Sequence, residues 1–247
     1  MAKNVFAGYV DEIYPYRFAG EMQILQVMGG MPSDPKVAEG WLKSKMGLTS
    51  EDIITQAVKE VMEARASSAE GPISPADALK EVDKTRHLNG FGSDEDGLYI
   101  EGRHLKAAIK EAASAARAVG NLDARYGLTK KGTLSFVAEH IIVVEERLYL
   151  SQADPTSGKI VNVKKPTGIR QSFPKNPITN QTGIQYTEYV TDAIVGFTVL
   201  TDWEFSEKEW ATIWITGGFQ GIGASRSQNY GRYTVTRWDQ LSTKKKK

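Results

Sequence analysis

The residues best suited to contact a charged ligand gather in one short stretch near the C-terminal end of the chain. Residues 217–232 read GGFQGIGASRSQNYGR, in which five of the sixteen positions are glycine. Glycine lets backbone N–H groups approach a phosphate closely, and an arginine side chain binds phosphate oxygens through two N–H groups. A tyrosine ring offers a face on which a base can stack. The candidate contacts in this glycine-rich segment are Gly221, Gly223, Arg226, Ser227, Tyr230 and Arg232.

Two familiar phosphate-binding motifs do not fit this segment. A dinucleotide-binding fingerprint needs a strand before its glycines and a helix after them, and the order expected here is the reverse. A P-loop needs Gly-Lys-Ser or Gly-Lys-Thr, which residues 217–232 lack. A helix C-cap followed by a flexible hairpin entry, where glycine is common, stays open as the alternative.

A second signal is a polar excursion over residues 151–189, rich in Pro and Gly. Five positive charges fall within 17 residues of it with no acidic residue among them: Lys159, Lys164, Lys165, Arg170 and Lys175. A solvated loop usually mixes signs, whereas a protrusion of one sign favours a polyanion, because phosphate contacts release counterions. We expect residues 160–163 and 184–189 to be the two arms of a hairpin. A long surface loop is the alternative.

Composition excludes several classes of function. The 247 residues carry 31 Lys and Arg against 30 Asp and Glu, a formal charge of +1, so any electrostatic function depends on local clustering. With no cysteine, disulfides, thiolate zinc sites and iron–sulfur clusters are excluded. No apolar run is long enough to span a membrane, and acidic residues follow the first ten positions before a signal-peptide core forms. We expect a cytoplasmic protein that needs no cofactor and does not contact a membrane.

Periodicity and turn residues predict the elements that would position these candidates. Residues 5–10 and 21–28 have strand character, as two strands or one bent hairpin. Residues 34–86 have helical character, with Thr49 and Ser74 as N-caps. The remaining predicted elements are a helix over 102–119, a strand over 137–150, a strand over 190–200, a helix from the capping box at 206–209 to Gly217-Gly218, and a strand over 230–238.

When the N-terminal strand is placed before the elements predicted from residue 102 onward, their order is βαββαβ. It predicts an α+β fold of the ferredoxin-like or RRM-like kind, in which two helices cover one face of an antiparallel sheet. The expected domains are an RRM-like core over 1–30 and 97–243, a helical insertion over 31–96, the basic excursion over 151–189 within the core, and a lysine tail over 244–247.

Two segments resemble motifs of the Cas7-like RAMP proteins, a CRISPR-associated family derived from the RRM fold. Residues 96–109, DGLYIEGRHLKAAI, resemble the family segment that reads roughly aromatic-I-P-G-S-S-L-K-G-A-(I/L)-R. Glu101 replaces the Pro, Arg103-His104 replaces Ser-Ser, and Lys110 stands in place of the Arg. Residues 221–226 and 230–232 resemble the glycine-rich loop that closes RAMP domains.

The resemblance implies a protein that binds single-stranded nucleic acid, usually RNA, through its backbone. It implies that Arg103, His104 and Lys106, at the start of the helix, contact the strand. The basic excursion occupies the slot of the family's thumb hairpin, between the second and third strands. Copies of such proteins stack along a guide RNA, so a homo-oligomer along the strand and other effector-complex subunits are expected partners. A phage or plasmid relative that works on single-stranded DNA fits equally well.

Catalysis is the main alternative to binding alone. None of the three histidines lies in an HExxH pattern, and His140 is expected to pack within an apolar strand. Asp94-Glu95-Asp96 does not match a calcium loop and is interpreted as a solvated turn. Some RAMP proteins cut RNA, and for that alternative Asp34 is the candidate. We favour a non-catalytic binder. The alternatives are a RAMP-type endoribonuclease and a structural or virion protein with an incidental RRM-like fold.

Aromatic residues near the N-terminus admit two interpretations. Tyr14, Tyr16, Phe18 and Trp41 lie near Arg17 and Lys43, a mixture that suits base stacking. We prefer core packing beneath the helical insertion.

Overall fold

The computed structural model describes residues 9–32, 50–67, 71–86, 88–123, 125, 129–173 and 185–241. The chain divides into two compact units, each considered by itself. The core unit comprises residues 1–28, 92–167 and 190–247. The second unit comprises residues 29–91 and 168–189.

The main sheet of the core unit contains three long strands in the order β12-β1-β11. They are β1 (Tyr16–Met28), β11 (Gln185–Thr201) and β12 (Tyr233–Leu241). Strand β12 is antiparallel to β1, with Thr236 bulging out of the ladder between them. The short strands β6 (Ile141–Val143) and β8 (Ser151–Ala153) pair antiparallel with β11.

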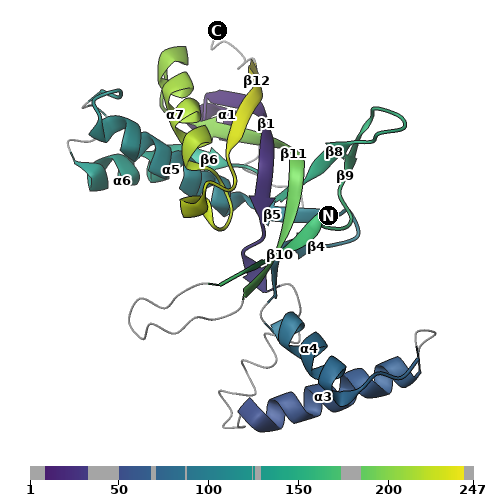
Figure 1. The fold of residues 1–247 in the computed structure, drawn as a ribbon. Helices are drawn as coiled ribbons and strands as arrows, with labels where there is room; N and C mark the ends of the chain where they lie inside the picture. Colours follow the sequence, from purple (N-terminus) through teal and green to yellow (C-terminus); the bar gives the residue numbers. More distant parts are fainter. Residues whose placement is uncertain are drawn as a thin grey trace. The chain divides into compact units, whose positions relative to one another are not determined.

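Two helices complete the predicted βαββαβ order. Helix α5 (Gly102–Ala118) lies between β1 and β6 in the chain, and α7 (Glu207–Gln220) lies between β11 and β12. Figure 1 shows α5, α6 and α7 grouped on one side of β1 and β11. The strand order with two crossover helices is the ferredoxin-like, RRM-like α+β fold that the sequence predicts.

Helix α5 forms because its apolar residues recur every three or four positions. Leu105, Ile109, Ala112 and Ala116 are all completely buried and form one stripe of the helix. The helix was predicted over 102–119, but it ends at Ala118 and the Val119 side chain is 71% exposed.

Helix α7 begins at a complete capping box. The Ser206 side chain accepts from the Glu209 amide, and the Glu209 carboxylate accepts from the Ser206 amide at 2.7 Å. The helix was expected to stop at Gly217-Gly218, but it continues to Gln220. These glycines permit close packing instead, because a Cβ on Gly218 would lie 2.4 Å from the Tyr233 carbonyl oxygen.

An aromatic cluster fills the space between α7 and the sheet. The Phe18 ring stacks on Trp238 at 4.8 Å, and Trp210 and Trp214 of α7 lie 4.9 and 5.0 Å from the same indole. Phe205 contacts Trp210 at 4.8 Å, as expected of a hydrophobic staple. Phe18 is thus a core residue, but it packs beneath α7 and not beneath the helical insertion. Trp41 and Lys43 lie outside the described residues.

The strand predicted over 137–150 is wrong for residues 137–140. Helix α6 (Lys130–His140) includes them and is capped by the Thr129 hydroxyl, which accepts from the Gly132 amide at 3.1 Å. His140 therefore ends a helix, and its Nδ1 lies 2.8 Å from Asp202. The chain then forms β6, breaks, and resumes as β7 (Arg147–Tyr149).

The basic excursion contains two hairpins, where one was predicted. Strand β9 (Ile160–Asn162) pairs with β8, so the expected pairing of 160–163 with 184–189 is wrong. Residues 185–189 of β11 pair instead with β10 (Gly168–Ser172), which belongs to the second unit. Figure 1 shows the β8–β9 hairpin projecting away from helices α5 and α7.

A three-stranded antiparallel sheet leads into α5. Its strands are β4 (Gly92–Ser93), β5 (Leu98–Glu101) and β7, in the order β4-β5-β7. Strand β5 ends at Glu101, directly before the first residue of α5.

The second unit contains two of the predicted helices. Helix α3 (Ser50–Ala66) contacts α4 (Pro75–Arg86), and Arg65 pairs with Glu81 at 2.9 Å. Ser74 caps α4 as predicted, accepting from the Asp77 amide at 3.2 Å. Thr49, the cap predicted for α3, lies outside the described residues. Two short strands, β2 (Met31–Pro32) and β3 (Leu88–Gly90), pair antiparallel.

The ends of the core unit differ modestly from expectation. Residues 9–10 do not belong to a strand, since Val10 begins the short helix α1 (Val10–Ile13), and the strand predicted at 21–28 extends back to Tyr16. The last strand begins at Tyr233 and not at Tyr230. Among the described helices none is long and apolar enough to cross a membrane.

Candidate nucleic-acid interface

The first turn of α5 presents Arg103 and His104 where the chain leaves β5. A Cβ on Gly102 would lie 1.9 Å from the Glu145 carbonyl oxygen, so only glycine lets the helix begin this close to the neighbouring backbone. The Gly102 amide donates to the Glu146 carbonyl at 2.8 Å. The N-cap residue Glu101 makes no side-chain cap hydrogen bond. Its carboxylate pairs instead with the Arg103 guanidinium.

The glycine-rich segment is bound to the end of β1. The Gly231 amide donates to Gln26 at 2.7 Å, and the Ala224 amide donates to Met28 at 3.2 Å. Within the loop, the Ile222 amide donates to the Gly231 carbonyl at 2.9 Å. The short 3-10 helix η3 (Arg226–Gln228) lies at the loop's outer turn, between Ser225 and Asn229, which both have left-handed backbone conformations.

The glycines of this loop allow its backbone conformation and its close internal contacts. The Gly221 amide donates to the Gly217 carbonyl at 2.8 Å, so it is not open to a phosphate as the sequence motif implied. Gly221 and Gly223 have φ values of +80° and +86°, which L side chains rarely adopt. Gly231 has φ +73°, and its Cβ would lie 1.8 Å from the Ile222 carbonyl oxygen. The loop therefore contributes side chains to the candidate site more than glycine amides.

Arg226 joins the loop to α5. Its Nη1 donates to Glu111 Oε2 at 2.5 Å and its Nη2 donates to Oε1 at 3.4 Å. The Arg226 side chain is 34% exposed and that of Glu111 is 47% exposed. Two segments 115 residues apart in sequence thus meet at one exposed ion pair.

His104 lies close to both arginines. Burial of its imidazole, together with the guanidiniums of Arg103 and Arg226, lowers the pKa of His104, against the opposing effect of the Glu101 carboxylate. The ring is consequently neutral near pH 7. Its Nδ1 is buried and has no hydrogen-bond partner among the described residues.

These residues define what we call the α5–loop cluster: Arg103, His104, Lys106, Lys110, Glu111 and Arg226. Lys106 and Lys110 stand four residues apart and therefore share one side of α5. Counting the N-cap Glu101, the cluster holds four cationic groups and two carboxylates, so its charge is 4 − 2 = +2. Sequence reasoning identified Arg103, His104, Lys106 and Arg226. It did not include Lys110 among the contacts, and it missed Glu111, since nothing in a sequence indicates a partner so distant.

Lys164 and Lys165 lie at the other end of β5. The Lys164 ammonium donates to the Glu95 carbonyl, and the Asn162 amide nitrogen donates to the Asp96 carbonyl at 3.1 Å. Both lysines are exposed. Among the described residues, no hydrogen bond or ion pair joins either lysine to the α5–loop cluster.

The acidic run Asp94-Glu95-Asp96 forms a turn beside Lys164. Asp94 Oδ1 accepts from the Asp96 amide at 2.9 Å, and Oδ2 accepts from Arg147 at 2.6 Å and from the Tyr149 hydroxyl at 2.9 Å. The run was interpreted as a solvated turn, but the Asp94 carboxylate also joins it to β7 through hydrogen bonds from Arg147 and Tyr149. Across the described ranges, no group of three or more His, Asp or Glu residues is placed to hold a metal ion.

The remaining predicted residues are dispersed. Arg232 is exposed, and its guanidinium donates to the Asn229 side chain at 2.8 Å. Ser227 is exposed and Tyr230 is half-buried, both on the glycine-rich loop. Arg170 is exposed on β10 in the second unit. Lys175 and Asp34 lie outside the described residues.

Comparisons with known proteins add a distant likeness. No family model matches the chain, and no curated protein matches it. A chain in the cryo-EM structure of the type III-B Cmr-beta bound to cognate target RNA is 10% identical, with a TM-score of 0.48 over 96% of this chain and 64% of that one. Cmr6 from Pyrococcus furiosus is 10% identical, with a TM-score of 0.35 over 90% of this chain and 98% of that one. The chain therefore spans less than two thirds of the first neighbour, and the fold assignment rests on its own strand order.

Proposed function

We propose that this protein binds single-stranded nucleic acid, with RNA favoured, through the phosphate backbone and without cutting it. The observation that carries the proposal is the meeting of Arg226 with α5 in a partly exposed cluster of net charge +2. Phosphates compete well for such groups, because an exposed ion pair contributes only about 0–1 kcal/mol. The RRM-like core and the two segments that resemble RAMP motifs support the same function.

Each part of the cluster has a distinct role. Arg103 and Arg226 exchange their carboxylate partners for phosphate oxygens, which guanidinium groups bind through two parallel N–H bonds. Lys106 and Lys110 add charge along the strand. His104 is neutral, so it offers a hydrogen bond to a sugar or base and not a further charge. Lys164 and Lys165 form a second contact on the β8–β9 side.

We further propose that copies assemble along one strand, as a Cas7-like backbone subunit would, together with other effector-complex proteins. A binding site built from phosphate contacts is indifferent to sequence, so adjacent copies can occupy successive segments. Light scattering with RNAs of increasing length tests this step. The mass of the complex should rise in whole protomers as the RNA lengthens, and one protomer at every length would contradict it.

The direct test is fluorescence anisotropy with labelled single strands of roughly 20 nucleotides, one RNA and one DNA. Binding of either strand, with the strand intact afterwards on a denaturing gel, supports the proposal. Cleavage would favour the endoribonuclease alternative. Assembly of the purified protein without affinity for either strand would favour a structural protein.

A further inference from the structure

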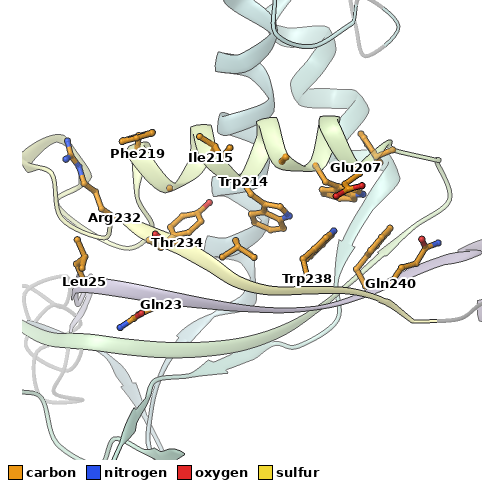
Figure 2. Close-up of a pocket in the computed structure, with 17 residues that line it drawn as sticks. Gln23, Leu25, Glu207, Trp214, Ile215, Phe219, Arg232, Thr234, Trp238 and Gln240 are labelled. Atoms are coloured by element: carbon orange, nitrogen blue, oxygen red, sulfur yellow. The ribbon is translucent and has the colours of Figure 1, made fainter.

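A groove lies between α7 and the edge strand β12, on the core unit. Its volume is about 920 Å³. Figure 2 shows Ile215 and Phe219 along the helix, Trp214 and Trp238 between helix and strand, and Arg232 and Leu25 together at one end. None of these features is required by the proposed nucleic-acid contact at α5.

The helix side of the groove is unusually apolar for an exposed surface. Glu207, Ala211, Ile215 and Phe219 stand four residues apart and form one stripe that lines the groove. Ile215 is 63% exposed and Phe219 is 70% exposed. A solvated stripe of a helix is normally polar, so contiguous exposed apolar side chains here indicate an interaction surface.

The strand side of the groove is a free edge from Val235 onward. Within the described residues β12 pairs only with β1, so the other edge of its backbone carries unpaired N–H and C=O groups beyond Tyr233, whose carbonyl is covered by Gly218 of α7. A strand added at this edge would lie beside the apolar stripe of α7. Its backbone would continue the sheet, and alternate side chains would cover Ile215 and Phe219.

The charges at the two ends are opposite and uncompensated. Arg232 bonds to Asn229 and has no carboxylate partner among the described residues, while Glu207 has no cationic partner there. Figure 2 places Arg232 near one end of the groove and Glu207 with Gln240 near the other. The lining is neutral in sum, which suits a polypeptide better than a polyanion.

We propose that this groove binds an extended segment of a partner protein as an additional β-strand. The segment runs antiparallel to β12, like the pairing of β12 with β1, and it alternates apolar and polar residues. It carries a basic residue at its N-terminal end, beside Glu207, and an acidic residue at its C-terminal end, beside Arg232. The inference is independent of the proposed nucleic-acid function.

The test uses the full chain and a pool of labelled octapeptides of the form Lys-Thr-X-Thr-X-Thr-X-Asp, where X is Val, Ile, Leu or Phe. A second pool exchanges the terminal Lys and Asp. The first pool should bind, and the exchanged pool should bind about threefold to tenfold more weakly, because two exposed ion pairs become repulsive. Equal or tighter binding of the exchanged pool, or no binding of either, overturns the proposal.

Two variants and one control variant locate the binding. Phe219→Glu should reduce affinity for the first pool more than about tenfold. Val119→Glu is the matched control, because Val119 is 71% exposed and does not line the groove. Arg232→Glu should shift preference toward peptides that end in Lys. If the Phe219→Glu and Val119→Glu variants bind the first pool with the same affinity, the peptides do not occupy this groove.

Other occupants give different results in the same experiment. If Phe219→Glu abolishes self-association seen by light scattering, a second copy fills the groove and the partner-strand proposal is wrong. If a single-stranded RNA displaces the peptides, and Phe219→Glu weakens RNA binding in parallel, the groove belongs to nucleic acid. Peptide binding that persists in the presence of RNA supports the proposal.

Discussion

The Arg226 guanidinium lies 2.5 Å from the Glu111 carboxylate, and this contact holds the glycine-rich loop against α5. The pair keeps a cation at the surface while partly neutralising it. A bound phosphate and Glu111 therefore compete for the same guanidinium. The two residues should affect nucleic-acid binding in opposite directions.

Replacing each partner tests this competition. Arg226→Ala should lower affinity for single-stranded RNA about tenfold or more, since a charge-assisted hydrogen bond contributes about 1.5–3 kcal/mol. Glu111→Gln should raise affinity about twofold to fivefold by releasing Arg226. Glu139→Gln, which removes an exposed acid from α6, is the control for net charge. Equal effects of Glu111→Gln and Glu139→Gln would show that the contact is irrelevant to binding.

The two lysines after β9 should act independently of the loop. Lys164 and Lys165 sit beyond one end of β5 and the α5–loop cluster beyond the other, with no contact between them among the described residues. Free-energy changes at such separated sites usually add to within about 0.5 kcal/mol. The affinity loss of a Lys164→Ala, Lys165→Ala, Arg226→Ala variant should equal the sum of the separate losses. A clear excess or deficit, measured by anisotropy, would mean that the groups act as one.

His104 should make stability depend on pH. Burial first, then Arg103 and Arg226, lower its pKa in the folded protein. The unfolded chain therefore takes up a proton at a higher pH, and stability is lost as the pH falls below about 6.5. Urea unfolding at about pH 7.5 and about pH 5.5 should show a smaller loss for His104→Gln than for the wild type. The difference should stay below ~1 kcal/mol, because the half-buried ring is partly screened by solvent. Identical losses in the two proteins would refute this role.

Gly231 should be indispensable to the loop. Gly231→Ala places a Cβ 1.8 Å from the Ile222 carbonyl oxygen at a residue with φ +73°. Gly120 has a similar φ of +79° with open space around it, so Gly120→Ala isolates the backbone cost. That cost is about 1–2 kcal/mol. Thermal unfolding should show a substantially larger loss for Gly231→Ala, and a similar loss for both variants would indicate that the loop relaxes freely.

Much of the fold could be predicted because local signals agree with the tertiary structure. The capping box at Ser206 and the buried stripe of α5 are set by residues a few positions apart, so sequence periodicity reveals them. Residues 137–140 were predicted as strand because they directly precede the β-branched run at 141–144, which has strand character. Burial of Thr133 and Val137, four positions apart, and the Thr129 cap fix them as a helix instead.

The candidate site was less predictable. Its cationic residues are recognisable by type, but their carboxylate partners are not, because Glu111 is distant from Arg226 in sequence. Gly217 and Gly218 were interpreted as a helix end, since glycine commonly follows one. Their function in packing against Tyr233 depends on which strand lies beneath α7, and no local pattern contains that information.

Salt dependence of RNA affinity tests the central claim most directly. Anisotropy titrations with a labelled single strand, from about 50 mM to about 200 mM salt, should give a log–log slope near −0.7 for each phosphate contact. The Arg103→Ala, Arg226→Ala variant should bind more weakly, with a slope shallower by about 1.4. Undiminished affinity with an unchanged slope in this variant would contradict phosphate binding at the α5–loop cluster.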